Sequence, residues 1–422
     1  MSARLKVLMS AYACRPGKGS EHEIGWQWAL HMARWHDVTV FTRAKNRPII
    51  EEELRRTHAE PPLPNFKYHD LKGPWLRWKS RFDFFRVYYI AWQRSARAKI
   101  KALLSEERFD LLHHVTFSSY RYPTAIWGHE APTIWGPVGG IESVPPAFMP
   151  VRDPKALFYE VVRGTTNITQ NLRAGMLFRR ARATDLTLVC TNEMMQLLAR
   201  LGVEGKLMPS AGMPPGRFPK RKLSLREGPL RMLYVGNIIP LKGLDLALEA
   251  LAASQTDAHF TLIGDGDFLE PARALTLKLG LKERVDFKGR LPQSATLAAY
   301  PDFDMLIFPS LHDTGGFAVL EAMSNYLPVI CLDVGGPGVM VNSQCGFKAP
   351  LGERAAVVQE LAAAIRAYDG NRELLRQHAE AARERVLQDF NWERKAEKMD
   401  AYYREVTERA RARGQSSLFS PK

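Results

Sequence analysis

Residues 309–337, PSLHDTGGFAVLEAMSNYLPVICLDVGGP, decide the fold of this 422-residue chain. A short apolar run at 305–308 precedes this stretch, and a second apolar run at 329–332 lies near its end. Between the two runs stand a glycine pair and a helical segment, with Asp313 and Glu321 eight positions apart. This order predicts a strand, a loop, a helix and a strand of a parallel sheet. Such sheets bind ligands at the carboxyl ends of their strands, so the loop is predicted to face a ligand.

The loop between the two predicted strands carries groups suited to a phosphorylated ligand. Asp313 is an acid, and Gly315 and Gly316 leave backbone amides accessible just before a helix that runs through 318–323. Helix N-termini and glycine-exposed amides favour anions such as phosphate. The stretch therefore predicts a site for a molecule that carries hydroxyl groups and a diphosphate.

The spacing of Asp313 and Glu321 resembles the acid-x7-acid signature of retaining, nucleotide-sugar-dependent GT-B glycosyltransferases, specifically glycosyltransferase family 4. Five further segments resemble motifs of this family and follow in the family's order. They are the glycine loop at 16–21, the hinge at 209–213, the strand–loop–helix at 234–243, and the strand ends at 262–266 and 285–290. The resemblance covers nearly the whole chain. It implies an α/β protein of the GT-B fold, with two Rossmann-like, doubly wound parallel-sheet domains facing a central cleft.

The organisation of the chain agrees with two such domains. Its length favours two to three domains of about 150 residues each. Apolar runs alternate with helix-length stretches in both halves, which is typical of doubly wound parallel sheets. The predicted parts are an acceptor-side domain at 1–208, a linker at 209–230 and a nucleotide-sugar domain at 231–390. By the resemblance, a terminal helix at 391–422 returns to the first domain and frays at its end.

The composition indicates which class of protein this is and which kind of partner it binds. Residues 1–222 hold 35 Lys and Arg against 19 Asp and Glu, while the remainder holds 24 against 26. The net charge of +14 therefore comes from the first half, which predicts an anionic partner for that domain. Four cysteines show neither metal-ligand spacing nor the density of a disulfide framework. No run approaches the about 18 apolar residues of a membrane span, and residues 5–9 are interpreted as a first strand rather than a signal peptide. We expect a cytoplasmic enzyme.

The segment 71–104 combines basic and aromatic residues in an unusual way. It holds nine Lys and Arg and a single acid, Asp83. Its eight aromatic residues are Trp75, Trp78, Phe82, Phe84, Phe85, Tyr88, Tyr89 and Trp92. One interpretation is that this segment contacts an anionic membrane surface, with the protein bound peripherally at the inner face of the plasma membrane. The other is a helix pair whose aromatic rings pack on the first domain while its cations are solvated. No helix-turn-helix, zinc or RNP-like pattern accompanies the charge, so no nucleic-acid partner is predicted.

The resemblance implies roles for individual residues. Lys242 is expected to stabilise the departing diphosphate, because negative charge builds on its oxygens as the glycosidic bond breaks. Glu321 is expected to accept hydrogen bonds from the ribose hydroxyls. Asp313 replaces the family's more usual glutamate near the donor sugar, and Asn237 stands where the family usually has an arginine. The backbone amides of Gly316 and Phe317 are expected to face sugar or phosphate oxygens.

Two histidines complete the predicted site. His113 and His114 end a first-domain strand, where the family commonly has a histidine near the reacting sugar. Successive strand residues point to opposite faces, so only one can line the cleft, and His114 is favoured because it lies nearer the strand's exit. The predicted catalytic residues are His113, His114, Lys242 and Asp313. The predicted donor-binding residues are Gly17, Gly19, Gly236, Asn237, Lys242, Gly264, Gly266, Arg290, Gly315, Gly316, Phe317 and Glu321.

Two shorter motifs have structural interpretations. Ser20 and Glu23 fit a capping box, S-x-x-E, that would open the helix after the first glycine loop. Asp302 and Asp304 form a D-x-D pattern, the metal motif of the other glycosyltransferase fold. Here it precedes an apolar strand, where acids at the strand start are normal. No metal and no cofactor are expected, the nucleotide sugar being a substrate.

The predicted function is transfer of a sugar from a nucleotide sugar to a hydroxyl of a glycan or lipid-linked acceptor. By the resemblance, the transfer retains the anomeric configuration, and its setting is the assembly of surface polysaccharide or lipopolysaccharide. UDP, GDP and ADP donors are all compatible with the sequence. One alternative is a degenerate, non-catalytic GT-B protein that binds nucleotide or a partner, supported by Asn237 and Asp313. Another is a GT-B enzyme of different reaction type, an epimerase or a phosphorylase.

Overall fold

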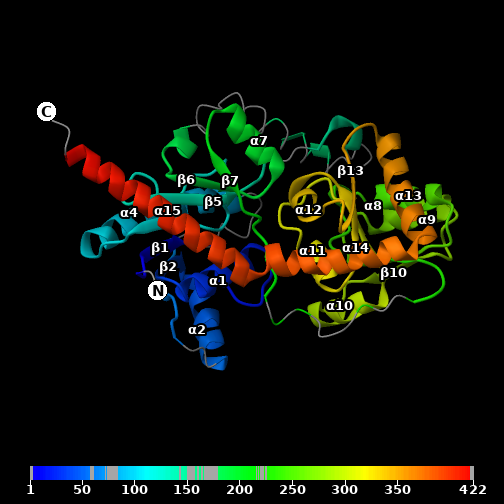
Figure 1. Cartoon of the computed structure of the whole chain (residues 1–422), viewed down its shortest axis with the longest axis horizontal. Coiled ribbons are helices and arrows are strands. Elements are labelled where there is room, and N and C mark those ends of the chain that lie inside the picture. The colour runs from blue at the N-terminus through cyan, green and yellow to red at the C-terminus, as the bar shows by residue number, and fades with distance from the viewer. Residues whose placement is uncertain are drawn as a thin grey trace.

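The structure is a computed structural model that describes residues 3–57, 61–71, 73, 84–141, 144–149, 157–158, 161–162, 165, 179–214, 216, 218, 223 and 226–418. It contains two parallel sheets, each at the centre of one domain (Figure 1). The first sheet has seven strands in the order β3-β2-β1-β4-β5-β6-β7. Its strands are β1 (Lys6–Ser10), β2 (Asp37–Arg43), β3 (Asn65–His69), β4 (Leu111–His114), β5 (Thr133–Val138), β6 (Leu186–Val189) and β7 (Gly205–Leu207).

The second sheet has six strands in the order β10-β9-β8-β11-β12-β13. They are β8 (Arg231–Val235), β9 (His259–Ile263), β10 (Val285–Gly289), β11 (Met305–Phe308), β12 (Val329–Leu332) and β13 (Gly346–Ala349). Strands β11 and β12 are buried along their whole length, which explains their unbroken apolar sequence. In both sheets the order reverses at a switch point, between β1 and β4 and between β8 and β11. Crevices for ligands form at such points.

Helices cover both faces of each sheet. In the first domain they are α1 (Ser20–Ala33), α2 (Arg47–Arg56), α4 (Phe84–Glu106) and α7 (Asn192–Arg200). In the second domain they are α8 (Leu244–Ser254), α9 (Leu269–Lys278), α10 (Gln293–Ala299), α11 (Phe317–Ser324), α12 (Gly335–Met340), α13 (Arg354–Gly370) and α14 (Arg372–Arg385). The last helix, α15 (Trp392–Leu418), runs from the second domain back along the first (Figure 1).

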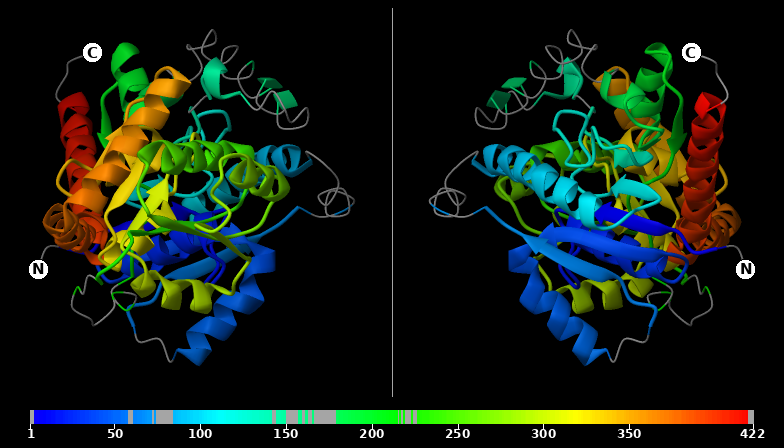
Figure 2. Two further views of the ribbon diagram at one scale, coloured as in Figure 1. Left: turned by 90° about the vertical axis from the view of Figure 1, so that its right-hand side faces the viewer. Right: turned by 90° about the vertical axis from the view of Figure 1, so that its left-hand side faces the viewer.

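The core of the first domain follows the alternation of its central strand. On β1, Val7 and Met9 belong to one hydrophobic cluster and Leu8 to another, because successive side chains point to opposite faces. The cluster of Val7 and Met9 is completed by α1 and α15, and that of Leu8 by α4. Figure 2 shows α15 and α4 on opposite sides of the molecule. The sheet is thus covered on one side by the chain's own C-terminal helix.

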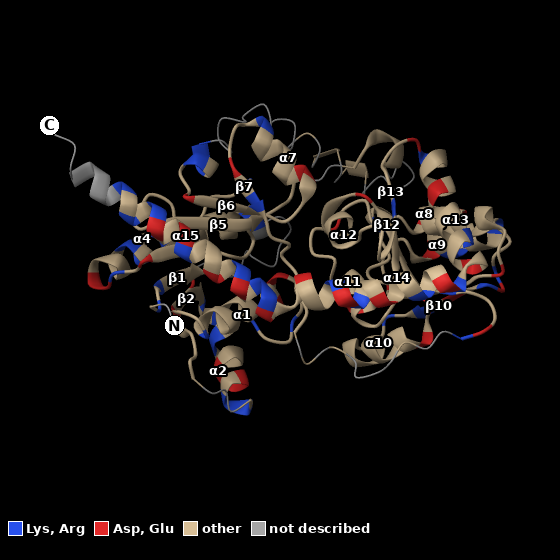
Figure 3. Ribbon diagram, in the orientation of Figure 1, with Lys and Arg blue, Asp and Glu red and all other residues tan. Residues whose placement is uncertain are grey.

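The chain crosses between the domains twice, and the two crossings pair with each other. The Met213 N–H donates to the Phe390 carbonyl at 2.7 Å, and the Trp392 N–H donates to the Met213 carbonyl at 3.2 Å. From there α15 continues along α1, with Met399 and Tyr403 buried in the first-domain core. Along the exposed side of α15 acids and bases alternate (Figure 3), including the pair of Arg394 with Glu397.

Helix α4 contains the described part of the basic aromatic segment. Tyr88, Tyr89 and Trp92 are buried in the first-domain core, and the Tyr88 hydroxyl donates to Asp70 at 2.9 Å. For these three rings the packing interpretation is therefore confirmed. Residues 72 and 74–83 lie outside the described residues, so membrane contact through that part stays a prediction. None of the described helices is long and apolar enough to span a bilayer.

Candidate active site

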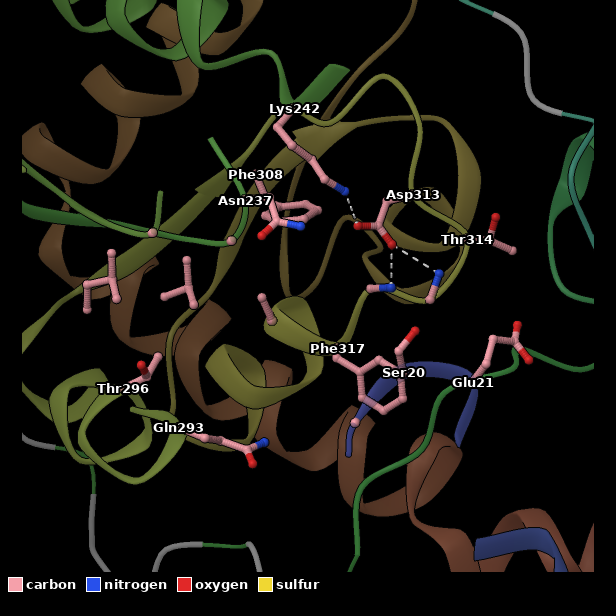
Figure 4. A pocket seen from close by; sticks show the side chains of 18 of the residues that line it. Ser20, Glu21, Asn237, Lys242, Gln293, Thr296, Phe308, Asp313, Thr314 and Phe317 are labelled. Atoms are coloured by element: carbon pink, nitrogen blue, oxygen red, sulfur yellow. Dashed lines mark hydrogen bonds and ion pairs between the residues drawn. The ribbon is translucent and has the colours of Figure 1, made fainter. Parts of the chain in front are cut away.

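A cavity of about 750 Å³ lies between the two domains, at the carboxyl edges of both sheets. The first domain contributes the loop after β1 and the start of α1, and the second contributes strand ends and the loop before α11 (Figure 4). Of the predicted residues, the cavity brings together Gly19, Gly236, Asn237, Lys242, Gly264, Arg290, Asp313, Gly315, Gly316 and Phe317. Gly17, Gly266, Glu321, His113 and His114 are not among the residues that line it.

Lys242 and Asp313 form an ion pair in this cavity. Lys242 is the last residue of a 3-10 turn at Pro240–Lys242, and its Nζ lies 2.5 Å from Asp313 Oδ2. The ammonium also lies 5.4 Å from the centroid of the Phe308 ring at the end of β11. Both charged side chains are largely buried, at 14% and 19% exposed. A cation is therefore held where the sequence predicts the diphosphate, and the Asp313 carboxylate compensates its charge.

Asp313 also organises the start of α11. Its Oδ1 accepts hydrogen bonds from the Gly315 and Gly316 N–H groups at 3.0 and 2.7 Å (Figure 4). Gly316 precedes the helix in a left-handed conformation with φ of 57°. The expectation that the Gly316 amide faces a ligand is wrong for this structure, because the Asp313 carboxylate takes it. The short side chain of aspartate explains this, since it reaches amides two and three residues ahead.

Glu321 lies one turn further along α11, behind the cavity wall. Its side chain is 9% exposed, and its Oε2 accepts a hydrogen bond from the Tyr300 hydroxyl at 3.0 Å. Burial and the nearby carboxylate raise the Tyr300 pKa, so the phenol keeps its proton for this bond. Ala318 on the same helix does line the cavity. The structure thus brings the helix, but not the Glu321 carboxylate, to the cavity surface.

The two histidines are both buried inside the first domain. His113 Nε2 donates to the Gly136 carbonyl at 2.9 Å, so its Nδ1 accepts from the Tyr403 hydroxyl at 2.6 Å. His114 contacts the Tyr89 hydroxyl at 3.3 Å and Ser10 Oγ at 3.4 Å. Burial lowers the pKa of His113 to about 4 and that of His114 to about 3, which keeps both imidazoles neutral. In this structure each histidine is a hydrogen-bonding core residue, and neither reaches the cavity.

The first-domain loop enters the cavity through Gly19, Ser20 and Glu21. The predicted capping box is wrong. Gly19 and Ser20 both have positive φ, 69° and 50°, and no side chain caps α1. Glu23 accepts instead from the Gly17 N–H at 3.0 Å, because the left-handed loop turns that amide toward it. Glu21 accepts from the Phe117 N–H at 2.9 Å, and burial raises the pKa of its carboxyl.

Gly264 and Gly266 lie where the loop after β9 packs against the loop after β8. A Cβ at Gly264 would lie 1.8 Å from the Gly236 carbonyl oxygen, and one at Gly266 would lie 2.4 Å from the Ile238 carbonyl oxygen. The glycines allow the loops after β8 and β9 to touch. Gly264 lines the cavity, whereas Gly266 supports it from behind.

Sequence reasoning missed several residues of the cavity wall. Gln293 and Thr296 lie in the first turn of α10, directly after Arg290 (Figure 4). Arg290 is predicted because it lies just past a strand. The same reasoning applies to residues at the start of the helix that follows. The other missed residues are Lys18, Ser20, Glu21, Ile24, Ser210, Val235, Ile263, Asp265, Leu291, Phe308, His312, Thr314 and Ala318.

The D-x-D pattern is engaged by arginines. Asp302 pairs with Arg226 at 3.0 Å, and the buried Asp304 pairs with Arg231 at 2.5 Å. Within the described ranges, no group of three His, Cys, Asp or Glu side chains could hold a metal ion. The two acids therefore act in the packing of the strand start, which is the interpretation that the sequence favours.

Comparison with known proteins agrees with this geometry. Residues 217–385 match the family model described as Glycosyl transferases group 1. The chain is 27% identical over 219 residues to a glycogen synthase of Mycobacterium tuberculosis, which covers 50% of this chain and 52% of that protein. It is 28% identical over 190 residues to a putative colanic acid biosynthesis glycosyltransferase, WcaL, of Salmonella typhimurium, with 43% and 46% covered. The chain thus spans about half the length of the curated relatives it matches.

Solved structures extend the likeness to the whole chain. HepE of Anabaena, solved in complex with UDP, superposes with a TM-score of 0.61 at 17% identity, covering 95% of this chain and 100% of that one. An identity this low supports the fold alone. The protein therefore has the GT-B fold, and its residues 217–385 carry the sequence pattern of the glycosyl transferases group 1 family.

Proposed function

We propose that this protein is a glycosyltransferase that moves a sugar from a nucleotide sugar, bound in the interdomain cavity, to a hydroxyl group. One observation carries the proposal. The domain that matches the glycosyl transferases group 1 model holds Lys242 against Asp313 in the cavity, at the N-terminus of α11. That arrangement offers a diphosphate the Lys242 ammonium, which Asp313 holds in position at the cavity.

Lys242 is the residue that we expect to stabilise the leaving group. The charge of Lys242 is compensated by Asp313 at 2.5 Å. A nucleoside diphosphate carries more negative charge than one carboxylate, so it competes for the ammonium as the donor binds. Charge grows on the diphosphate while the glycosidic bond breaks, and a preorganised cation is worth most at that stage. Arg290, in the same cavity, supplies a second cation.

The finer features of the reaction belong to the same proposal. Transfer retains the anomeric configuration and needs no metal, with the leaving diphosphate as base for the incoming hydroxyl. The first domain holds the acceptor, next to Ser20 and Glu21. The role is in surface polysaccharide assembly, for which the name of the WcaL relative gives support. UDP is the first base to test, because HepE was solved with it.

The test is a binding and transfer assay with UDP, GDP and ADP and their glucose conjugates. It compares the wild type with Lys242→Gln and with Lys288→Gln, which removes an exposed lysine of the same domain that pairs only with Asp286. We expect one nucleotide to raise the melting temperature of all three proteins. Donor hydrolysis should fall about 100-fold in Lys242→Gln and stay unchanged in Lys288→Gln.

The alternatives give different results in this assay. Nucleotide binding with hydrolysis and transfer at background in the wild type would favour a non-catalytic GT-B protein. A nucleotide-linked product, or phosphorolysis, would favour an epimerase or a phosphorylase. Absence of any nucleotide effect would contradict the proposal. The anomeric configuration of a transferred sugar, read by NMR, decides between retention and inversion.

A further inference from the structure

Four cations gather on the first-domain side of the cavity. Arg15 and Lys18 lie in the loop after β1, Arg43 ends β2, and Lys45 follows it. They surround His22 in the first turn of α1. All stand at the carboxyl edge of the first sheet, and Lys18 itself lines the interdomain cavity. We call Arg15, Lys18, Arg43 and Lys45 the first-domain basic cluster.

The members of the cluster are close enough to repel one another. Burial, together with the charges of Lys18, Arg43, Lys45 and Arg15, lowers the pKa of His22 to about 3. The pKa of Lys45 is lowered by burial first and then by Arg43, Lys18 and Arg15, against a raising effect of Asp70. His22 is therefore neutral, and the four cations around it have no charge to balance them at its position.

Two acids lie near the cluster, and each accepts hydrogen bonds from neighbouring groups. Asp70 accepts from the Lys45 N–H at 3.0 Å and from the Tyr88 hydroxyl at 2.9 Å. Glu23 accepts from the Gly17 N–H and from Gln27. Among the described residues, none of the four cations of the cluster forms an ion pair with a carboxylate within 4.0 Å.

Hydrogen-bond donors and acceptors at the cluster are also unused. The Arg15 Nε and the His22 Nδ1 are buried and have no hydrogen-bond partner in the described part of the chain. The buried Arg43 donates to Tyr12, at 3.1 Å to the carbonyl and 3.2 Å to the hydroxyl, with its guanidinium 4.1 Å above the Tyr12 ring. Burying charge and polar groups without partners costs free energy, so a purely structural role would favour an acid here.

A phosphoryl group has the negative charge and the acceptor oxygens that this cluster lacks. It brings up to two negative charges and several acceptor oxygens, and it forms charge-assisted hydrogen bonds with arginine and lysine. The proposed function assigns the donor diphosphate to Lys242 and Arg290 on the second domain. We propose that the first-domain basic cluster binds a phosphoryl group of the acceptor. The acceptor is then a phosphate ester or diphosphate ester whose free hydroxyl reaches the cavity past Lys18. This inference rests on the proposed function.

The test uses the full chain and inorganic phosphate as the probe. Phosphate is titrated calorimetrically into the free protein and into protein saturated with the nucleotide that stabilises it, with sodium chloride at matched ionic strength as the blank. The variants are Arg15→Gln and Lys45→Gln. Lys67→Gln, an exposed lysine on β3 outside the cluster, removes the same charge from the same domain.

We expect phosphate to bind both forms of the wild type and of Lys67→Gln. Its affinity should fall about ten-fold in Arg15→Gln and in Lys45→Gln, with nucleotide affinity unchanged. Lys45 is exposed, so its variant keeps the fold if Arg15→Gln does not. Glucose 6-phosphate and detergent-dispersed polyprenyl phosphate, titrated in the same way, tell a soluble acceptor from a lipid-linked one by which binds more tightly than phosphate.

Two results would overturn the inference. Equal phosphate affinity in the wild type and both cluster variants would show that the cluster binds no phosphoryl group. A loss of nucleotide affinity in Arg15→Gln and Lys45→Gln, with no phosphate binding to the saturated protein, would assign the cluster to the donor diphosphate. Failure of every nucleotide to bind would contradict the proposed function alone, because phosphate titration of the free chain still reports on the cluster.

Discussion

The Asp313 carboxylate links Lys242, the candidate catalytic residue, to the start of α11. Asp313 holds Lys242 with Oδ2 and the Gly315 and Gly316 amides with Oδ1. The two functions place different demands on the side chain. The amides need an acceptor oxygen, which an amide side chain also provides, whereas Lys242 needs the charge.

Substitution of Asp313 separates these two functions. Asp313→Asn keeps an acceptor for the loop amides, so we expect it to lose less than about 1 kcal/mol of unfolding free energy. Asp313→Ala loses the cap as well and should cost about 1–2 kcal/mol more. Urea denaturation of the three proteins measures the difference. Equal losses in the two variants would contradict the capping role.

Gly264 makes a second prediction at the scale of single residues. A Cβ there would lie 1.8 Å from the Gly236 carbonyl oxygen, so Gly264→Ala must push the β8 and β9 loops apart. We expect a loss of about 2–4 kcal/mol in unfolding free energy and weaker nucleotide binding, because both loops line the cavity. Gly352→Ala is the control, since nothing lies within 4 Å of its Cβ position. Thermal and urea unfolding should show Gly352→Ala within about 0.5 kcal/mol of the wild type.

At the scale of elements, hydrophobic periodicity and the order of the strands are enough to predict the strands, the helices and the sites at the strand ends. The strand, loop, helix and strand around residues 309–337 are present as β11, α11 and β12. Sites at strand ends follow from the same rule, which explains why Asn237, Lys242 and Arg290 all line the cavity. Each of these positions is fixed by the backbone of a parallel sheet alone.

Side-chain directions depend on packing that periodicity does not contain. Glu321 turns to the buried Tyr300, a partner 21 residues away. His113 bonds to Tyr403, which lies 290 residues away on a helix that crosses back from the other domain. The capping box at Ser20 fails because two successive residues adopt positive φ, which the S-x-x-E pattern does not encode. Such features arise from tertiary contacts.

The bond between β4 and α15 yields a prediction at this scale. Tyr403→Phe leaves the buried His113 Nδ1 without its donor at 2.6 Å, so we expect a loss of about 1–3 kcal/mol in unfolding free energy. Nucleotide affinity should not change, because His113 does not line the cavity. The neighbouring Tyr402→Phe, whose ring lies under Lys206, is the control and should be nearly neutral. Lost nucleotide affinity in Tyr403→Phe with unchanged stability would point to a role for His113 in the site.

At the scale of the whole molecule, the two crossings of the chain pair with each other at one junction between the domains. There the segment after β7 meets the start of α15, and Lys395 of α15 bonds to that segment. Its Nζ donates to the Pro209 carbonyl and, at 2.9 Å, to the Ala211 carbonyl. The same group lies 5.5 Å from the Trp28 ring and 5.1 Å from the Trp392 ring. Domain closure over a donor would turn about this junction, so its lysine connects the crossings to the first-domain core.

Burial at this junction makes stability depend on pH. Burial, together with the charge of Lys398, lowers the pKa of Lys395 from 10.5 to about 7. Between these two values the unfolded chain carries a proton on this amine and the folded chain does not. Unfolding therefore takes up a proton, and the folded state gains stability as pH rises from about 7 to 10.

The variant Lys395→Met isolates this effect. Methionine fills similar volume without a titratable group, so the unfolding free energy of the wild type minus that of Lys395→Met should rise with pH. We expect a rise on the order of a few kcal/mol between pH 7 and pH 10, measured by urea denaturation at half-unit steps. A difference that stays constant over this window would mean that the amine remains charged against the two carbonyls and the two rings. In that case the junction would hold a permanent cation, and closure of the domains would be independent of pH.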